Sequence, residues 1–435
     1  MKRVLLGGLK TLALPRWWLS NRAAFMLDAA NSGFEAKLSL TVGNLRKSAI
    51  QESRSMSKCC SARRLIAAFL VVAINTPTPA KDGKELPIQG GMILMFVPGQ
   101  SKFLMQGGRT MRPERGIYGF AVVNAGDGKV IGVIQRDLRK NPQVSPDGAS
   151  FMTLSEKSDK IELWQTSTVK PRKELDVLKS PSDVAFSPDG KFLAVVGHID
   201  DFGAPLALKA VDLPSGKERW VMPLAKTDSD RGTAQLATSK SGELLVAQSG
   251  VWKLVDFQTG KVQAAFEGRV SRETEFSSGG LHLSHDARRF VHVTRAFVNV
   301  WEVDGRKRLF TLPDKYTPAY TPAKFVSGDD RHSDILVIGS RDGLVGMLNI
   351  STLKLTEFGD KHEATITDID ASATKRIAVT ASEDFRIKVW DLETAQLIET
   401  LVADKSAVRT IAISSDGERI ASCYENGSVR IWNLK

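Results

Sequence analysis

The side chains of a nucleophilic triad occur within one short segment near the C-terminus. They are His362, the hydroxyls of Thr380 and Ser382, and Asp384, with Trp390 shortly afterwards. A histidine held by a carboxylate can take the proton of a hydroxyl, which is the chemistry of acyl transfer. The same groups can also satisfy one another inside a protein, because buried polar atoms need hydrogen-bond partners. The surrounding elements decide between these two interpretations.

Other patterns for catalysis or metal binding are weak. The closest histidine pair is His282-x-x-His285, and on an extended segment this offset points the two rings to opposite faces. Asp200 and Asp201 are adjacent acids that fit either a cation site or a solvated loop. The sequence has no GxSxG, P-loop, HExxH or CxxC pattern. We therefore expect no catalytic residue, no metal site and no cofactor.

The segment with the histidine and aspartate is one copy of a repeat. ASEDFRIKVWDLETAQLIETL, residues 381–401, alternates apolar and polar residues between short polar turns, which indicates strand, turn, strand. Equivalent third-strand ends recur at spacings of 41 to 47 residues, at Val123, Trp164, Val211, Val255, Trp301, Leu348, Trp390 and Trp432. Polar turns such as those in VSPDGASFMT, FSPDGKFLAVV and ISSDGERIAS run in phase with them. Two markers with one period in the forties predict an all-β chain of propeller blades, each with four short strands.

SPDGKFLAVVG, ASEDFRIKVWD and ASCYENGSVRIWN closely resemble the WD-repeat β-propeller family, and the resemblance covers roughly residues 88–435. It implies that His362, Thr380 or Ser382, Asp384 and Trp390 form one hydrogen-bonded group that fastens a blade, with Thr380 the favoured hydroxyl. The set is complete in this repeat alone. The resemblance also implies a protein without catalytic activity.

Eight markers predict a closed propeller of eight four-stranded antiparallel blades, with seven blades and one degenerate unit as the alternative. The chain ends at Lys435, just after a third strand, so the last blade lacks its outer strand. In the family that this chain resembles, the N-terminal segment usually supplies that strand, so the resemblance implies KELPIQ, residues 84–89, as the donor. Closure would remove exposed sheet edges, which otherwise pair with other chains.

The first eighty residues differ in character from the repeats. Residues 56–80 have the parts of a signal peptide: basic residues, the apolar run LIAAFLVVAI at 65–74, and the small residues Thr78 and Ala80. Ten apolar residues are too few to span a bilayer as a helix. We expect residues 1–55 to be an upstream extension, disordered or not translated, and 81–435 to be the propeller. The protein would then be periplasmic, envelope-associated or secreted; the alternatives are a transit peptide, an uncleaved anchor, or a cytoplasmic protein.

Charge and cysteine content follow the same division. The formal net charge is +11, but residues 1–80 hold 12 of the 60 basic and only 3 of the 49 acidic residues, so the propeller is nearly neutral. A nearly neutral domain gives little support for a nucleic-acid partner. Cys59 and Cys60 lie in the leader, which leaves Cys423 without an intrachain partner. We expect a monomer without a disulfide.

Function in a repeat scaffold is expected on its loop-rich faces. The candidate partner-binding residues lie at or beside the turn between the second and third strands: Ser158, Asp200, Asp201, Phe202, Arg341, Glu383 and Glu425. The first hypothesis is a scaffold that binds a protein or peptide there. The alternative is an extracytoplasmic enzyme or a small-molecule or sugar-binding propeller that uses the central channel. On the first strands, Asp183 and Asp368 are the acids that recur at one position.

Overall fold

A computed structural model describes the part of the chain that carries the repeats. The described residues are 83–89, 91–107, 119–134, 142–154, 160–200, 205–224, 234–248, 251–267, 280–293, 298–312, 316, 322–329, 331–402 and 406–434. All of them belong to a unit that spans Pro79–Lys435. The expected extension at 1–55 and signal peptide at 56–80 lie outside the described residues and stay predictions.

Each blade is a four-stranded antiparallel sheet whose strands follow one another in sequence. The first blade consists of β2 (Met92–Phe96), β3 (Lys102–Gln106), β4 (Phe120–Asn124) and β5 (Val130–Ile134). The second consists of β6 (Gln143–Val144), β7 (Ser150–Leu154), β8 (Lys160–Gln165) and β9 (Lys170–Asp176). The third consists of β10 (Lys179–Phe186), β11 (Phe192–His198), β12 (Leu206–Asp212) and β13 (Glu218–Pro223). The fourth consists of β14 (Ala234–Thr238), β15 (Glu243–Gln248), β16 (Val251–Asp256) and β17 (Val262–Glu267).

The remaining blades repeat this order. The fifth consists of β18 (Leu281–Leu283), β19 (Arg289–Val293), β20 (Val298–Glu302) and β21 (Lys307–Thr311). The sixth consists of β22 (Ala323–Val326), β23 (Ile335–Gly339), β24 (Val345–Asn349) and β25 (Leu355–Glu357). The seventh consists of β26 (Ile366–Ser372), β27 (Ile377–Ser382), β28 (Arg386–Asp391) and β29 (Leu397–Val402). The eighth consists of β30 (Val408–Ile413), β31 (Arg419–Tyr424), β32 (Ser428–Asn433) and β1 (Lys84–Gln89). All regular elements within the described ranges are strands.

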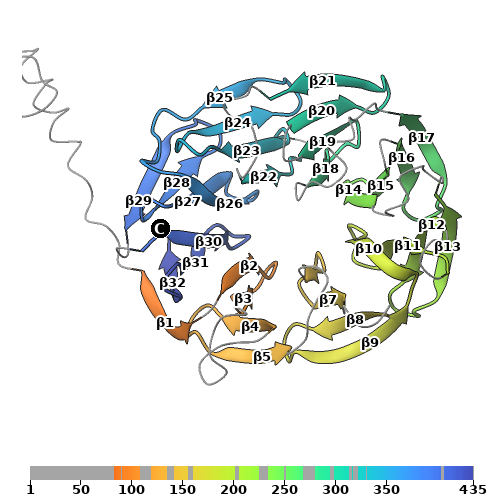
Figure 1. Ribbon diagram of the computed structural model, residues 1–435, viewed down its shortest axis with the longest axis horizontal. Helices are drawn as coiled ribbons and strands as arrows, with labels where there is room; N and C mark the ends of the chain where they lie inside the picture. The colour runs from red at the N-terminus through yellow and green to blue at the C-terminus, as the bar shows by residue number, and fades with distance from the viewer. Residues whose placement is uncertain are drawn as a thin grey trace, which may run out of the picture. The chain divides into compact units, whose positions relative to one another are not determined.

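The eight sheets form a ring, and the labelled first strands, such as β2, β10, β22 and β30, lie toward the centre (Figure 1). The N-terminal strand β1 (orange) lies beside β32 (blue) and completes the last blade. The pairing is antiparallel, with Lys84 opposite Ile431, and Arg430 forms an ion pair with Glu85 at 3.1 Å. Gly83 lies so close to the Trp432 ring that a Cβ there would be 2.7 Å from it. The prediction of eight blades, closed by KELPIQ, is confirmed.

The apolar core lies between neighbouring blades. One cluster joins Phe103 and Val123 of the first blade to Cys423 and Ile431 of the eighth, with Leu86 of β1 among them. Another joins the seventh and eighth blades around Trp432. Because each sheet has two faces and packs against two neighbours, the central strands are apolar on both sides. Cys423 is fully buried, its Sγ lies 3.5 Å from the carbonyl oxygen of Gly91, and burial raises the pKa of its thiol to about 11.

Within the described residues, no helix has the length and apolar character needed to cross a membrane.

Candidate functional site

Residues from the predicted partner-binding set lie on exposed turns between second and third strands. Arg341, Glu383 and Glu425 occupy equivalent positions in the sixth, seventh and eighth blades, and all three are exposed. Asp200 is exposed in the equivalent connection after β11. Since every blade runs in the same direction, these turns share one face of the ring, called here the turn face. Ser158, Asp201 and Phe202 lie outside the described residues.

Phe385 is the unusual residue of the turn face. The sixth and eighth blades place glycines, Gly343 and Gly427, at this turn position with φ of 79° and 84°. Phe385 adopts φ of 69° at the same position, and its residue surface is 43% exposed. An L-residue in this left-handed region costs about 1 kcal/mol. In the seventh blade an exposed aromatic residue therefore adopts a conformation that glycine adopts in the two neighbouring blades.

Directly beneath that turn, the predicted histidine set comes together. His362 Nδ1 lies 2.9 Å from Asp384 Oδ2, and His362 Nε2 lies 2.7 Å from Thr380 Oγ1. Trp390 Nε1 donates to the same Thr380 hydroxyl at 2.8 Å. Ser382, the alternative hydroxyl, donates instead to the carbonyl of Ala364.

One tautomer satisfies all members of this group. With the hydrogen on Nδ1, His362 donates to Asp384, accepts from the Thr380 hydroxyl, and leaves that oxygen to accept from Trp390. Burial favours a raised pKa for Asp384, but hydrogen bonds from His362 and two backbone N–H groups outweigh it and lower the pKa to about 2. His362 and Thr380 are 0% exposed, so no substrate can reach this hydroxyl. The geometry of a triad is present here inside a closed core.

The other blades keep parts of this arrangement. Trp432 donates to Ser422 at 2.8 Å, and Trp164 donates to Thr153 at 2.9 Å. In the fifth blade the Trp301 indole N–H has no partner. His292, on the neighbouring strand β19, is also buried with an unpartnered Nδ1, and burial lowers its pKa to about 4. The tryptophan–hydroxyl bond is thus more widespread than the histidine–aspartate pair.

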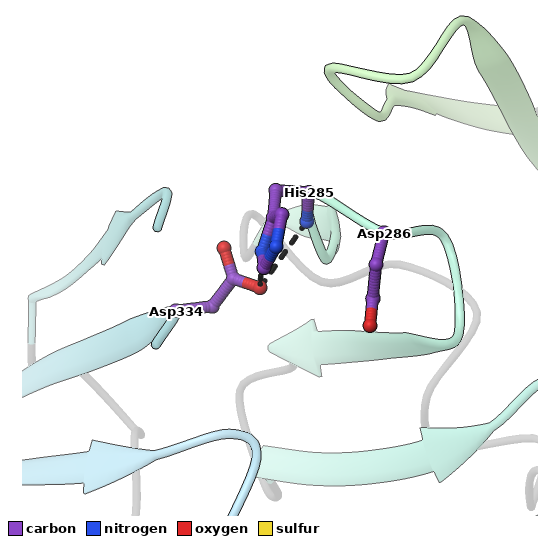
Figure 2. Close-up of side chains that lie close together, drawn as sticks. All are labelled: His285, Asp286 and Asp334. Carbon is purple, nitrogen blue, oxygen red and sulfur yellow. Dashed lines mark hydrogen bonds and ion pairs between the residues drawn. The ribbon is translucent and has the colours of Figure 1, made fainter. Parts of the chain in front are cut away.

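A second histidine–aspartate pair joins the fifth and sixth blades, and the sequence patterns did not single it out. Figure 2 shows dashed lines from His285 to Asp334, with Asp286 beside them. Asp334 Oδ2 accepts from the His285 backbone N–H at 3.1 Å and lies 2.9 Å from Nδ1, and Asp334 Oδ1 accepts from the Gly328 N–H at 2.7 Å. His282 lies elsewhere and stacks on Phe325 at 5.1 Å.

The same three residues offer ligand atoms within 4.8 Å of one another. Hydrogen bonds already use those carboxylates, however, because Asp286 Oδ1 accepts from the Ser284 hydroxyl and the Arg288 N–H. A metal ion would have to displace these bonds. The group is therefore best explained as a hydrogen-bonded fastening between two turns.

The recurring acids of the inner strands contact the next blade. Asp183 on β10 accepts from the Leu236 N–H, and Asp368 on β26 accepts from the Ile411 N–H, each at 2.9 Å. Asp370, two residues along β26, accepts from Ile413 at 2.8 Å. Asp370 also forms an ion pair with Lys324 of β22 at 2.7 Å.

The environment of Asp368 is unusual. Burial, reinforced by the neighbouring Asp370, raises the pKa of Asp368 to about 7 even though the Ile411 N–H opposes the shift. Asp183 and Asp368 therefore fasten blades together through equivalent bonds, and this use of the carboxylates does not support a channel site.

Two segments match the family model for the WD domain, G-beta repeat, at residues 353–391 and 395–433. The chain is a β-propeller that contains WD repeats. Apoptotic protease-activating factor 1 of Rattus norvegicus is 24% identical over 294 residues, which cover 67% of this chain and 21% of that protein. The striatin homolog of Dictyostelium discoideum is 21% identical over 32% of this chain and 18% of its own length. The WD-repeat chain thus spans about a fifth of each of these relatives.

Among solved structures, the computationally designed protein Ika8 resembles this WD-repeat chain with a TM-score of 0.56 and 18% identity. The match covers 80% of this chain and 98% of Ika8. At that identity the likeness concerns the fold alone.

Proposed function

We propose that this chain is a non-catalytic interaction scaffold that binds a protein or peptide partner on the turn face. The WD repeats and the similarity to striatin and apoptotic protease-activating factor 1 support a protein-interaction scaffold. The observation that carries the choice of face is Phe385, which is exposed and held at φ of 69° where neighbouring blades have glycine. Aromatic residues are favoured anchors in protein interfaces, and retained backbone strain is typical of functional positions.

The charged residues around Phe385 suit a polar rim. Glu383 lies two residues before it, and Arg386 forms an ion pair with Glu363 at 2.9 Å. Arg341 and Glu425 extend the same face into the adjacent blades. An exposed aromatic residue within a rim of both charge signs fits a folded domain or peptide, whose own surface carries both.

A Phe385→Gly substitution separates binding from folding. Glycine fits the left-handed conformation, so we expect an unchanged or higher melting temperature and at least about tenfold weaker partner binding. A photocrosslinking residue at position 385 of the full chain should identify the partner in the native host. Ile398→Ser, on the outer strand β29 where Ile398 is 54% exposed, is the matched control and should bind normally. Normal binding by Phe385→Gly would overturn the proposed face.

We also propose that the protein is exported. The support is the sequence of residues 56–80, with basic residues, ten apolar residues and a small-residue cleavage site. Fractionation of the native host, with the mature N-terminus determined by mass spectrometry, tests this. A start near Lys81 in an extracytoplasmic fraction is the expected result, and an uncut chain in the cytosol would overturn it.

A further inference from the structure

A hollow of about 360 Å³ lies between the sixth and seventh blades. Its walls are the turns β22–β23, β24–β25, β26–β27 and β28–β29, which contribute Arg331, His332, Lys354, Arg376 and Glu393. Turns between first and second strands, and between third and fourth, lie on the face opposite the turn face. The hollow is therefore separate from the proposed partner surface.

Arg376 lies in the wall of this hollow with most of its hydrogen-bonding capacity unused. The residue is only 8% exposed, yet its Nε and Nη1 have no hydrogen-bond partner. Nη2 donates to the carbonyl of Ser333 at 3.2 Å. Within the part of the chain that the structure describes, the carboxylates that act on this guanidinium, Glu393, Asp329 and Asp334, do so without a hydrogen bond to it. A buried cation without a bonded counter-charge is costly, so the site favours an anion beside it.

The backbone fixes Arg376 in place. It has φ of 53°, and its carbonyl accepts from the Leu392 N–H at 2.9 Å. Burial lowers the pKa of Arg376, and the more distant Glu393, Asp329 and Asp334 offset this only in part. The guanidinium remains charged at neutral pH because its ordinary pKa is so high.

The other described lining residues add positive charge and donors. Arg331 and Lys354 are exposed at the edge, and Glu393 is the single carboxylate among the described lining residues, with a side chain that is 60% exposed. The Asn349 side-chain oxygen accepts from the Ser351 and Thr352 N–H groups. Its NH₂ group carries the two donor hydrogens of the amide and can donate to a ligand. The described lining residues therefore include three permanent cations and one carboxylate, while Asp329 and Asp334 act on Arg376 from outside the lining.

We propose that this hollow binds a small phosphate ester or inorganic phosphate, with Arg376 in the wall and Arg331 and Lys354 at the edge. A phosphate carries between one and two negative charges at neutral pH and three acceptor oxygens, which match these cations and the Asn349 amide. The volume falls within the range of small-molecule sites. The binding site is independent of the partner surface around Phe385.

Calorimetric titration of the full chain with inorganic phosphate and with glycerol phosphate tests this proposal. Binding of either probe below about 10 mM is expected. Tighter binding of glycerol phosphate would indicate an ester as the ligand, and tighter inorganic phosphate binding would indicate the free ion. No heat from either probe at that concentration would overturn the proposal, as would equal affinity for succinate.

Arg376→Met should weaken phosphate binding at least about tenfold, because it removes the central charge and keeps the apolar stem. Arg288→Met is the matched control. Arg288 occupies the equivalent turn of the fifth blade, where its carbonyl accepts from Val303 as that of Arg376 does from Leu392, but its side chain is exposed. The double variant Arg331→Gln/Lys354→Gln changes exposed residues only and should weaken binding several-fold. Unchanged affinity in Arg376→Met, or in the double variant if Arg376→Met does not fold, would overturn the assignment.

Discussion

Thr380 concentrates the buried polar contacts of the seventh blade on one hydroxyl group. It accepts from Trp390 and donates to His362, which in turn donates to Asp384. These hydrogen bonds connect the β27–β28 turn, which holds Asp384, to Trp390 on the third strand β28. Removing this one oxygen leaves two other buried groups without partners, and such orphaned groups cost more than the bond itself contributes.

Thr380→Val, which preserves shape, should lower the free energy of unfolding by about 2–4 kcal/mol, because it orphans both the Trp390 N–H and His362 Nε2. Thr153→Val orphans only the Trp164 N–H, so about 1–2 kcal/mol is expected. Denaturant titration of both variants gives the comparison. Equal losses would show that the histidine contributes nothing to the network.

The sequence predicted the members of this group but not the exposed aromatic residue above it. Side-chain types and a family resemblance identify His362, Thr380 and Asp384, because hydrogen bonding depends on chemical type. The importance of Phe385 rests on a backbone dihedral angle, which side-chain type does not reveal. A signal was present, since RDG and ENG in the neighbouring repeats align with EDF.

The inner strand β26 combines two carboxylates with the N–H groups of the next blade. Asp368 and Asp370 accept from Ile411 and Ile413 of β30, so side chains of one sheet bond to the backbone of another. This brings ionisable groups into the inner part of the ring, and its stability then depends on pH.

Asp368→Asn tests that dependence. The unfolded chain ionises Asp368 near 3.8, whereas the folded protein holds the proton to about pH 7, so between these values the unfolded state binds fewer protons. The contribution of Asp368 to the free energy of unfolding should therefore decrease by about 1–3 kcal/mol from pH 4 to pH 7. In denaturant titrations, the free energy of unfolding of wild type minus that of Asp368→Asn should decrease by this amount as the pH rises from 4 to 7.

Asp176→Asn, an exposed change on β9, controls for the loss of one charge. His282 acts in the opposite direction, because burial and Lys324 lower its pKa to about 4 and its contribution is lost as pH falls from 6.5 toward 4. Comparison with the variant isolates the carboxylate from this background. A difference between wild type and Asp368→Asn that stays constant with pH would contradict the prediction.

Strand alternation predicted the blades well, but it did not predict which ionisable side chains of the inner strands lie close together. His282, Lys324 and Asp370 come from three successive blades, and their proximity depends on the ring geometry. The β22–β23 connection is also longer than the four- or five-residue connections between first and second strands in the other blades, and this brings Arg331 and His332 against the seventh blade. Spacing within a repeat contains no information on such contacts between repeats.

For the whole molecule, one strand pairing closes the ring. Leu86 of β1 is 3% exposed and packs between the first and eighth blades. The spacing of the repeats and the missing last strand, taken together with the family resemblance, predicted this closure. The predicted domain boundaries at 55 and 80 lie outside the described residues and stay predictions.

Leu86→Asp should open the ring. A buried charge without a partner should cost about 3 kcal/mol or more and expose the edge of β32. We expect a lower melting temperature and concentration-dependent self-association, measured by thermal denaturation and light scattering. Glu85→Ala removes only the exposed ion pair with Arg430 and should change stability by at most about 1 kcal/mol. A monomeric Leu86→Asp variant with wild-type stability would show that the pairing of β1 with β32 contributes little to the free energy of unfolding.

The pairing of β1 with β32 also determines when the ring can close during synthesis of the chain. Of the ring strands, β1 leaves the ribosome first and β32 last, and the ion pair between Glu85 and Arg430 joins residues 345 positions apart. The ring cannot close before β32 has been synthesised. A chain exported during its synthesis would therefore enter a secretion channel before the ring can close, and removal of the proposed signal near Lys81 would place β1 at the new N-terminus.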